Sequence, residues 1–125
     1  MGYYTRYELT LEDTGKYNTS DIVSYMKEMY KESGEEKFYP FSYDFDDYIG
    51  LDKNYYLYMC SDECKWYDHT EEMLEMSKRF PNAVFCLYGV GEESEDIWYT
   101  YYKNGKSQYC PAKIVFDEYD ESRLA

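Results

Sequence analysis

Residues 83–105 read AVFCLYGVGEESEDIWYTYYKNG, and this stretch carries the signals that decide the fold. Residues 83–88 are apolar on both faces, which is typical of a central strand that is covered on two sides. Residues 97–102 are mostly aromatic and β-branched, as strands often are. Asn104 and Gly105 form a strong type I′ hairpin signal. We therefore predict strands at 83–88 and 97–102, and a further strand after the turn at 112–116.

The first 34 residues predict a strand followed by a helix. Residues 3–11 place Tyr and Leu on one face with the period of two that marks a half-buried strand. Residues 18–21 (Asn-Thr-Ser-Asp) offer several helix caps, and Gly34 is a natural helix end. The apolar positions that recur at helical spacing between them are Ile22, Met26, Met29 and Tyr30.

A second strand and helix are expected between residues 55 and 80. Residues 55–60 predict the strand, and Asp68 is expected to cap a helix that Pro81 ends. The residues that mark its buried face are Met73, Leu74, Ser77 and Phe80. Residues 41–46, before this strand, alternate rings and polar groups, so they fit either a short edge strand or an exposed acidic loop.

This order of elements, β-α-(β)-β-α-β-β-β, predicts a single α+β domain over residues 1–125. Layer packing places both helices on one face of a mostly antiparallel sheet of four or five strands, which is the ferredoxin-like arrangement. The residues expected to be buried together are Phe85, Leu87, Trp98, Tyr7 and Leu74. The acidic segment 117–125 is expected to fray as a tail.

The composition indicates an aromatic core and an acidic surface. The chain of 125 residues contains 19 tyrosines and six methionines and has a formal net charge of −13. Aromatic rings, with methionine as filler, supply the burial that the few aliphatic residues cannot. Such a charge disfavours direct contact with nucleic-acid phosphates. Without a membrane-length apolar run or a secretion leader, we expect a cytoplasmic protein with no membrane contact.

Cysteine and histidine do not predict a metal site. Cys60, Cys64 and His69 could supply three zinc ligands, but their spacing matches no common zinc finger and no fourth ligand is near. Cys86, in an apolar strand, is typical of a buried free thiol. We therefore expect reduced structural cysteines, no metal, no cofactor and a solvated His69 at the start of a helix.

Signals for an enzyme are weak. Residues 89–96 (GVGEESED) begin like a dinucleotide-binding loop, but the third glycine is missing and the acids would repel a pyrophosphate. Pairs of carboxylates are expected by chance among 26 acidic residues. We therefore predict that the protein is not an enzyme.

Clustered carboxylates are the strongest functional signal. Rows of them can occupy a protein surface that is built for phosphates, although solubility alone would also account for the charge. The preferred partner-binding cluster mixes acids with rings and consists of Asp44, Asp46, Asp47, Tyr43, Phe45 and Tyr48. The second candidate is the acidic turn formed by Glu92, Glu93, Glu95 and Asp96.

The second half of the chain, roughly residues 60–116, resembles the YubB-type family of small ferredoxin-like proteins carried by phages and plasmids. The resemblance rests on packing and turn residues, namely Lys65-Trp66, Phe80-Pro81, the strand around 85–87, Gly89-x-Gly91-Glu92-Glu93, Trp98 and Asn104-Gly105. It implies no catalytic residues. It does imply a mobile-element origin.

Charge and resemblance together predict a phage- or plasmid-type inhibitor. It would bind a basic nucleic-acid-handling host protein, such as a CRISPR effector or another defence nuclease, as DNA-mimicking anti-CRISPR and anti-restriction proteins do. The alternative is a protein that binds a nucleotide or a signalling molecule in an aromatic pocket. That alternative needs convergent polar groups that include at least one Arg or Lys, and the chain has only three arginines, Arg6, Arg79 and Arg123.

Overall fold

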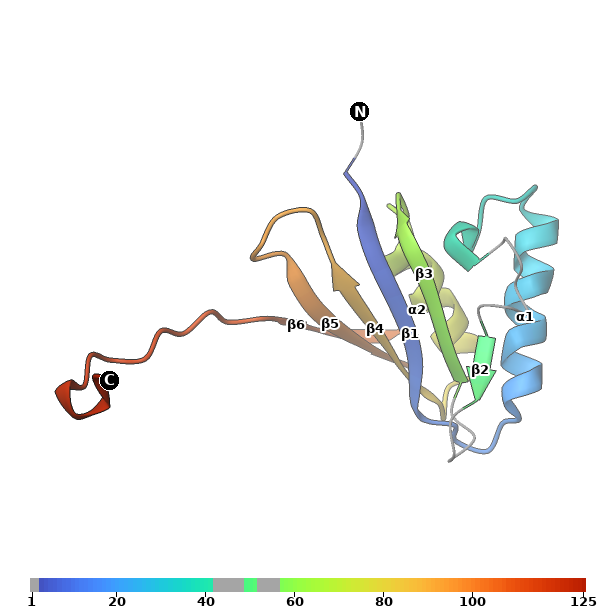
Figure 1. The fold of residues 1–125 in the computed structure, drawn as a ribbon. Coiled ribbons are helices and arrows are strands. Elements are labelled where there is room, and N and C mark those ends of the chain that lie inside the picture. Colours follow the sequence, from blue (N-terminus) through green and yellow to red (C-terminus); the bar gives the residue numbers. More distant parts are fainter. Residues whose placement is uncertain (1–2, 42–48, 52–56) are drawn as a thin grey trace.

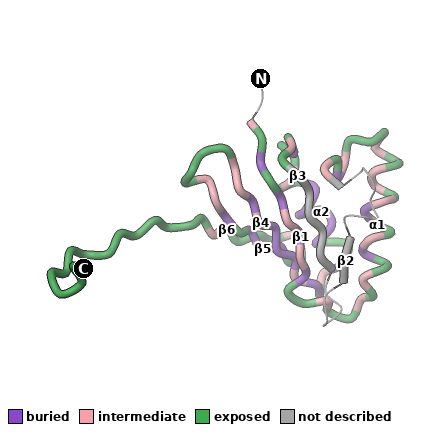
Figure 2. Tube along the Cα trace, viewed as in Figure 1, coloured by how far each residue is buried: buried purple, intermediate pink, exposed green. Residues whose placement is uncertain are grey.

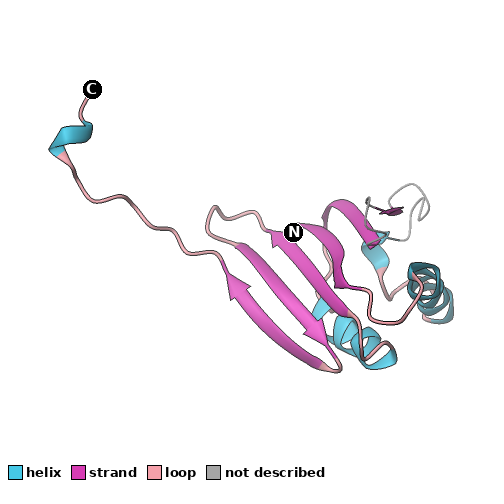
Figure 3. Cartoon of the chain, turned by 90° about the horizontal axis from the view of Figure 1, so that it is seen from below, coloured by secondary structure: helices cyan, strands magenta, loops and turns pink. Residues whose placement is uncertain are grey.

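The computed structural model describes residues 3–41, 49–51 and 57–125. In it an antiparallel sheet of order β2-β3-β1-β4-β5-β6 carries two α-helices on one side (Figures 1 and 3). The strands are β1 (Thr5–Asp13), β2 (Ile49–Leu51), β3 (Leu57–Cys64), β4 (Val84–Val90), β5 (Ile97–Lys103) and β6 (Lys106–Pro111). The helices are α1 (Thr19–Glu32) and α2 (His69–Arg79), with short 3-10 turns at η1 (Tyr39–Phe41) and η2 (Glu121–Arg123).

The chain order produces a ferredoxin-like topology with an added hairpin. The elements β1-α1-β2 and β3-α2-β4 interlock, so that β1 lies between β3 and β4 and is antiparallel to both. This arrangement confirms the predicted α+β class, with two helices on one face of an antiparallel sheet. Strands β5 and β6 extend the sheet beyond β4. With the three-residue β2 counted, the sheet has six strands.

The core lies between the sheet and the helices, and strand alternation explains which side chains reach it. In β1, Tyr7, Leu9 and Leu11 are buried, and Leu9 and Leu11 pair with Leu87 and Phe85 of β4 on the same face. Figure 2 shows these buried positions along β1, β4 and β5. The other core side chains include Ile22 and Met26 of α1, Met73 and Met76 of α2, and Trp98 and Tyr102 of β5.

Four of the five residues predicted to share the core are buried, and the fifth lies at its border. Tyr7, Phe85, Leu87 and Trp98 are buried, whereas Leu74 is only half-buried. Met76 is fully buried on α2 instead, because α2 turns its Met73–Met76 side toward the sheet.

Strand β4 is central, but helices cover only one of its faces. Phe85 and Leu87 point toward the helices, while Cys86 and Tyr88 point to the opposite face. The prediction of cover on both sides is therefore only half right, because on the second face the side chains of β4 pack against side chains of the neighbouring strands and not against a helix. Tyr88 packs against Tyr99 with ring centroids 4.7 Å apart, and Cys86 is 2% exposed. Cys86 is a buried free thiol, as predicted, and burial raises its pKa to about 11.

The last strand lies earlier in the chain than predicted. The strand expected at 112–116 instead occupies Lys106–Pro111, directly after the turn. Asn104 and Gly105 have φ values of 48° and 74°, as a type I′ turn requires, and a two-residue turn makes the next residue the first of the strand. β6 lacks an apolar pattern because its side chains are mostly exposed at the edge of the sheet. Residues 112–125 are exposed and project away from the sheet in Figure 1.

Candidate functional site

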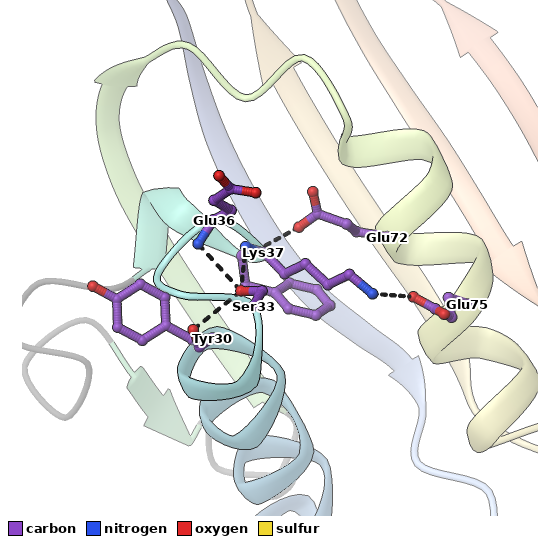
Figure 4. Close-up of polar contacts among 7 residues, drawn as sticks. Tyr30, Ser33, Glu36, Lys37, Glu72 and Glu75 are labelled. Carbon is purple, nitrogen blue, oxygen red and sulfur yellow. Dashed lines mark hydrogen bonds and ion pairs between the residues drawn. The ribbon is translucent and has the colours of Figure 1, made fainter.

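The segment that follows α1 folds back against α2, and Ser33 directs this turn. Its hydroxyl donates to the carbonyl oxygen of Tyr30 at 3.1 Å and accepts from the backbone N–H groups of Glu36 and Lys37 at 3.2 and 2.9 Å (Figure 4). Gly34 allows the reversal because its φ is 71°, in the left-handed region that glycine adopts without strain. One serine thus organises the exit from the helix.

Glu72 and Glu75 of α2 hold this segment in place. The Glu72 carboxylate accepts a hydrogen bond from the backbone N–H of Phe38, whose ring is buried in the core. The Lys37 ammonium forms an ion pair with Glu75 at 3.1 Å, one helical turn further along (Figure 4). Burial raises the pKa of the Glu72 carboxyl, and the hydrogen bond from Phe38 opposes that rise.

Two adjoining cavities of about 540 and 560 Å³ lie along this contact, and we call them together the acidic groove. Glu36, Asp68 and Glu72 line both cavities. The acidic residues that line the groove are Glu35, Glu36, Asp68, Glu71, Glu72 and Glu75. The basic residues that line it are Lys37, Lys65 and Lys78. Lys37 is engaged with Glu75, and the Lys65 ammonium lies 5.0 Å from the centre of the Tyr4 ring. The groove therefore carries an excess of negative charge.

Some of these carboxylates also stabilise α2. Glu71 and Glu72 stand in its first turn, where the helix dipole favours negative charge. Asp68 is the N-cap residue, as predicted, but its side chain makes no capping hydrogen bond. Its carboxylate lines the groove instead.

The predicted acidic turn joins β4 to β5 and is anchored through one of its four acids. The Tyr3 hydroxyl donates to the Asp96 carboxylate at 2.6 Å and accepts from the backbone N–H of Glu93 at 3.1 Å. This bond to Asp96 is the main reason why the pKa of Tyr3 is raised. Glu92, Glu93 and Glu95 are exposed. Asp96 is therefore a structural residue, whereas the other three present their charges to solvent.

The preferred cluster from the sequence falls in 42–48, outside the described residues: Asp44, Asp46, Asp47, Tyr43, Phe45 and Tyr48. Its role as a contact surface stays a prediction. Sequence reasoning did not select Glu35 and Glu36, which the fold brings beside α2. They are more than 30 residues from α2 in the chain, so their proximity has no local signal.

His69 is not the solvated residue that we expected. It is half-buried at the first position of α2, and its ring stacks on Trp98 with centroids 5.3 Å apart and an interplanar angle of 22°. Burial lowers the pKa of its imidazole. Trp98 is buried, as predicted, and Trp66 is buried as well. The cause of the difference is the aromatic wall of β5, which the local sequence around His69 does not reveal.

Within the described part of the chain, no group of three or more His, Cys, Asp or Glu side chains is arranged to hold a metal ion. Cys110 carries a free thiol, like Cys86. Neither of the two described helices combines the length and apolar character needed to cross a bilayer. Comparison with family models, with curated proteins and with solved structures finds no match. The YubB-type resemblance therefore stays a prediction, and the acidic groove is the candidate site that the geometry itself provides.

Proposed function

We propose that this protein is a non-enzymatic binding protein that presents carboxylates to the basic surface of a nucleic-acid-handling protein. The observation that carries the proposal is the acidic groove, in which two segments far apart in sequence join their charges. Carboxylates form strong charge-assisted hydrogen bonds to arginine, and a field of one sign steers an oppositely charged partner during its approach. The partner would be bound through the surface on which it normally holds phosphates.

Rings beside the groove support a protein partner. Tyr39 and Tyr67 line one end of it and are 49% and 65% exposed. Tyrosine offers a large, rigid contact area and a hydroxyl at low entropic cost, which is why it is enriched at protein interfaces. Acids and exposed tyrosines together suit a partner with basic and apolar groups side by side.

The YubB-type resemblance gives the proposal its biological setting. A protein carried by a phage or plasmid would act in the host cytoplasm. A CRISPR effector or another defence nuclease would then be its partner, because both bind nucleic acid through basic channels. Carboxylates seated in such a channel would exclude the nucleic acid.

The test begins with capture of partners from a host lysate at low and high salt. A nucleic-acid-binding protein that is retained at low salt and released at high salt is the expected result, because exposed charge pairs are screened beyond about 8 Å at physiological ionic strength. Association kinetics are then measured with that purified partner, with and without competing DNA.

Three variants with matched charge changes locate the contact. The groove variant is Glu35→Gln, Glu36→Gln, Glu71→Gln. The turn variant is Glu92→Gln, Glu93→Gln, Glu95→Gln, and the loop variant is Asp44→Asn, Asp46→Asn, Asp47→Asn. Each removes three negative charges and spares the residues with structural hydrogen bonds, Glu72 and Asp96.

We expect the groove variant to slow association about tenfold or more at low ionic strength, and the turn variant to slow it much less. A larger effect of the loop variant would move the contact to residues 42–48 and keep the mechanism. Equal association rates for all three variants and the unmodified protein would contradict the electrostatic mechanism and leave the charges as a solubility device.

A further inference from the structure

Another cavity, separate from the acidic groove, lies between the start of α2 and the β5–β6 hairpin. It has a volume of about 380 Å³ and is lined by His69, Thr70, Trp98, Thr100, Ser107 and Tyr109. We call it the aromatic slot. Its volume falls within the range of small-molecule sites, roughly 300–1,000 Å³.

Three rings form the walls of the aromatic slot. His69 stacks on Trp98, and the Tyr109 ring also lies near Trp98, with ring centroids 6.3 Å apart and an interplanar angle of 45°. Tyr7 and Trp66 contact the His69 ring as well, with centroids 5.7 and 5.9 Å away. Tyr109 is 62% exposed, so it stands at the mouth of the slot. The inner wall is thus rigid and the outer wall is open to solvent.

Hydroxyl groups supply the polar contacts. Thr70, Thr100 and Ser107 line the slot, and each hydroxyl can both donate and accept a hydrogen bond. Beside them lies the Tyr102 hydroxyl, which is buried and has no hydrogen-bond partner among the described residues. Burial raises the pKa of this hydroxyl, and the nearby Thr70 and Thr100 side chains oppose that rise without forming a hydrogen bond of normal geometry with it. Tyr102 is not one of the residues that line the slot, so the hydroxyls that a ligand can reach are those of Thr70, Thr100 and Ser107.

The slot lacks the charges that would hold an ion. None of its lining residues is Lys, Arg, Asp or Glu. Burial lowers the pKa of His69, which keeps the imidazole uncharged near neutral pH. The net charge of −13 further disfavours an anion. The nucleotide pocket considered from the sequence required at least one Arg or Lys, and this slot has none.

We propose that the aromatic slot binds an uncharged, planar heteroaromatic ring of nucleobase size, stacked on the exposed ring of Tyr109 and hydrogen-bonded to Thr70, Thr100 and Ser107. Stacking on aromatic side chains and bonds to ring nitrogen and oxygen atoms are the two interactions that such a ring offers. This site is independent of the acidic groove, because the two share no lining residue.

The probes are adenosine, guanosine, cytidine and uridine, each compared with its 5′-monophosphate. His69 is the single histidine of the chain, so its imidazole gives one resolved NMR signal inside the slot. A bound ring shifts that signal through its ring current. We expect at least one nucleoside to produce a saturable shift, and its monophosphate to bind more weakly because no cation lines the slot.

Tyr109→Ala removes the outer wall at an exposed position, and Tyr119→Ala in the exposed tail is the matched control. Loss of one stacking ring should weaken binding about fivefold or more in Tyr109→Ala and leave the control unchanged. Absence of a saturable shift with all four nucleosides, or equal affinity in Tyr109→Ala, would overturn the proposal. Tighter binding of the monophosphates would overturn its claim that the ligand is uncharged.

Discussion

Glu72 shows how one side chain couples local backbone geometry to the acidic surface. It is 7% exposed, and its carboxylate holds the backbone N–H of Phe38. Phe38 has a φ of 55°, a left-handed conformation that costs a non-glycine residue about 1–2 kcal/mol. Burial of the Phe38 ring and the bond to Glu72 offset this cost. The same carboxylate lines both cavities of the acidic groove.

Glu72→Ala should therefore destabilise the fold by more than Glu71→Ala, which loses only a favourable charge in the first turn of α2. Removing the acceptor leaves the buried N–H of Phe38 unpaired, which costs about 1–3 kcal/mol. Glu71 is the neighbouring, exposed acid and serves as the control. The measurement is the free energy of unfolding in urea. Equal stabilities of the two variants would show that the bond from Phe38 does not hold the segment.

Glu72→Gln tests the raised pKa. The folded protein binds the Glu72 proton more tightly than the unfolded chain does. Ionisation of Glu72 therefore lowers the free energy of unfolding as the pH rises from the ordinary pKa of a glutamate through the raised pKa of Glu72. Glutamine keeps the oxygen acceptor and does not titrate. We expect the unfolding free energy of Glu72→Gln, relative to that of the unmodified protein, to increase between about pH 4 and pH 7. A constant difference over that range would contradict the raised pKa.

Single-residue roles were the least predictable part of the site. From the sequence, Glu72 is one acid among several on a helix, since the residue that it bonds is 34 positions away. His69 is similar, because its surroundings are set by Trp98 on a strand that comes later in the chain. Periodicity reports which face a residue occupies but not what lies opposite that face.

At the scale of elements, the regular patterns predicted most of the structure. β1 follows alternation, α1 follows helical spacing, β4 is a continuous apolar run and β5 is rich in aromatic and β-branched residues, and their positions agree closely with the expected ranges. β6 was placed too late because it is an exposed edge strand whose polar residues lack a pattern. Its position is set instead by the turn and by α2, where the Ser77 hydroxyl accepts the backbone N–H of Gly105 at 2.8 Å.

Phe85→Ala tests the central place of β4. Phe85 is fully buried between β4 and the helices, and loss of an aromatic side chain from a core costs about 3–5 kcal/mol. Tyr99→Ala on the adjacent strand is the control, because Tyr99 is 46% exposed on the other face of the sheet. The melting temperature should fall sharply for Phe85→Ala and only slightly for Tyr99→Ala. Similar melting temperatures would place Phe85 outside the core.

At the scale of the whole molecule, the acidic groove depends on the complete fold. Its two walls are brought together by the turn after α1 and by the packing of α2 on the sheet, and neither event is visible in a local window of sequence. The sequence did predict a surface rich in carboxylates, because net charge is a property of composition alone. Composition does not predict which carboxylates share a cavity.

The net charge of −13 should lower the stability of the folded protein, and the dependence of that stability on salt concentration tests this. Like charges repel in the compact state, and two ion pairs among the described residues, Lys37 with Glu75 and Arg123 with Asp117, are exposed and weak. Raising the ionic strength shortens the screening length from about 30 Å at 0.01 M to about 3 Å at 1 M. The free protein should therefore become more stable as salt is added, and each 1 kcal/mol gained raises the melting temperature by roughly 2–8 °C for a domain of this size.

The complex with a basic partner should respond to salt in the opposite direction, because there the same charges attract. The two slopes can be compared in one experiment, with unfolding of the free protein and dissociation of the complex followed in NaCl from 0.02 to about 0.5 M, a range over which exposed charges become screened. The groove variant lacks three negative charges, so relief of repulsion should offset the small loss from Glu71 at the start of α2, and its stability at low salt should stay close to that of the unmodified protein while it associates more slowly. A loss of stability as large as that of Glu72→Ala, with an unchanged association rate, would show that these carboxylates serve the fold, and the case for the groove as a charged binding surface would then fail.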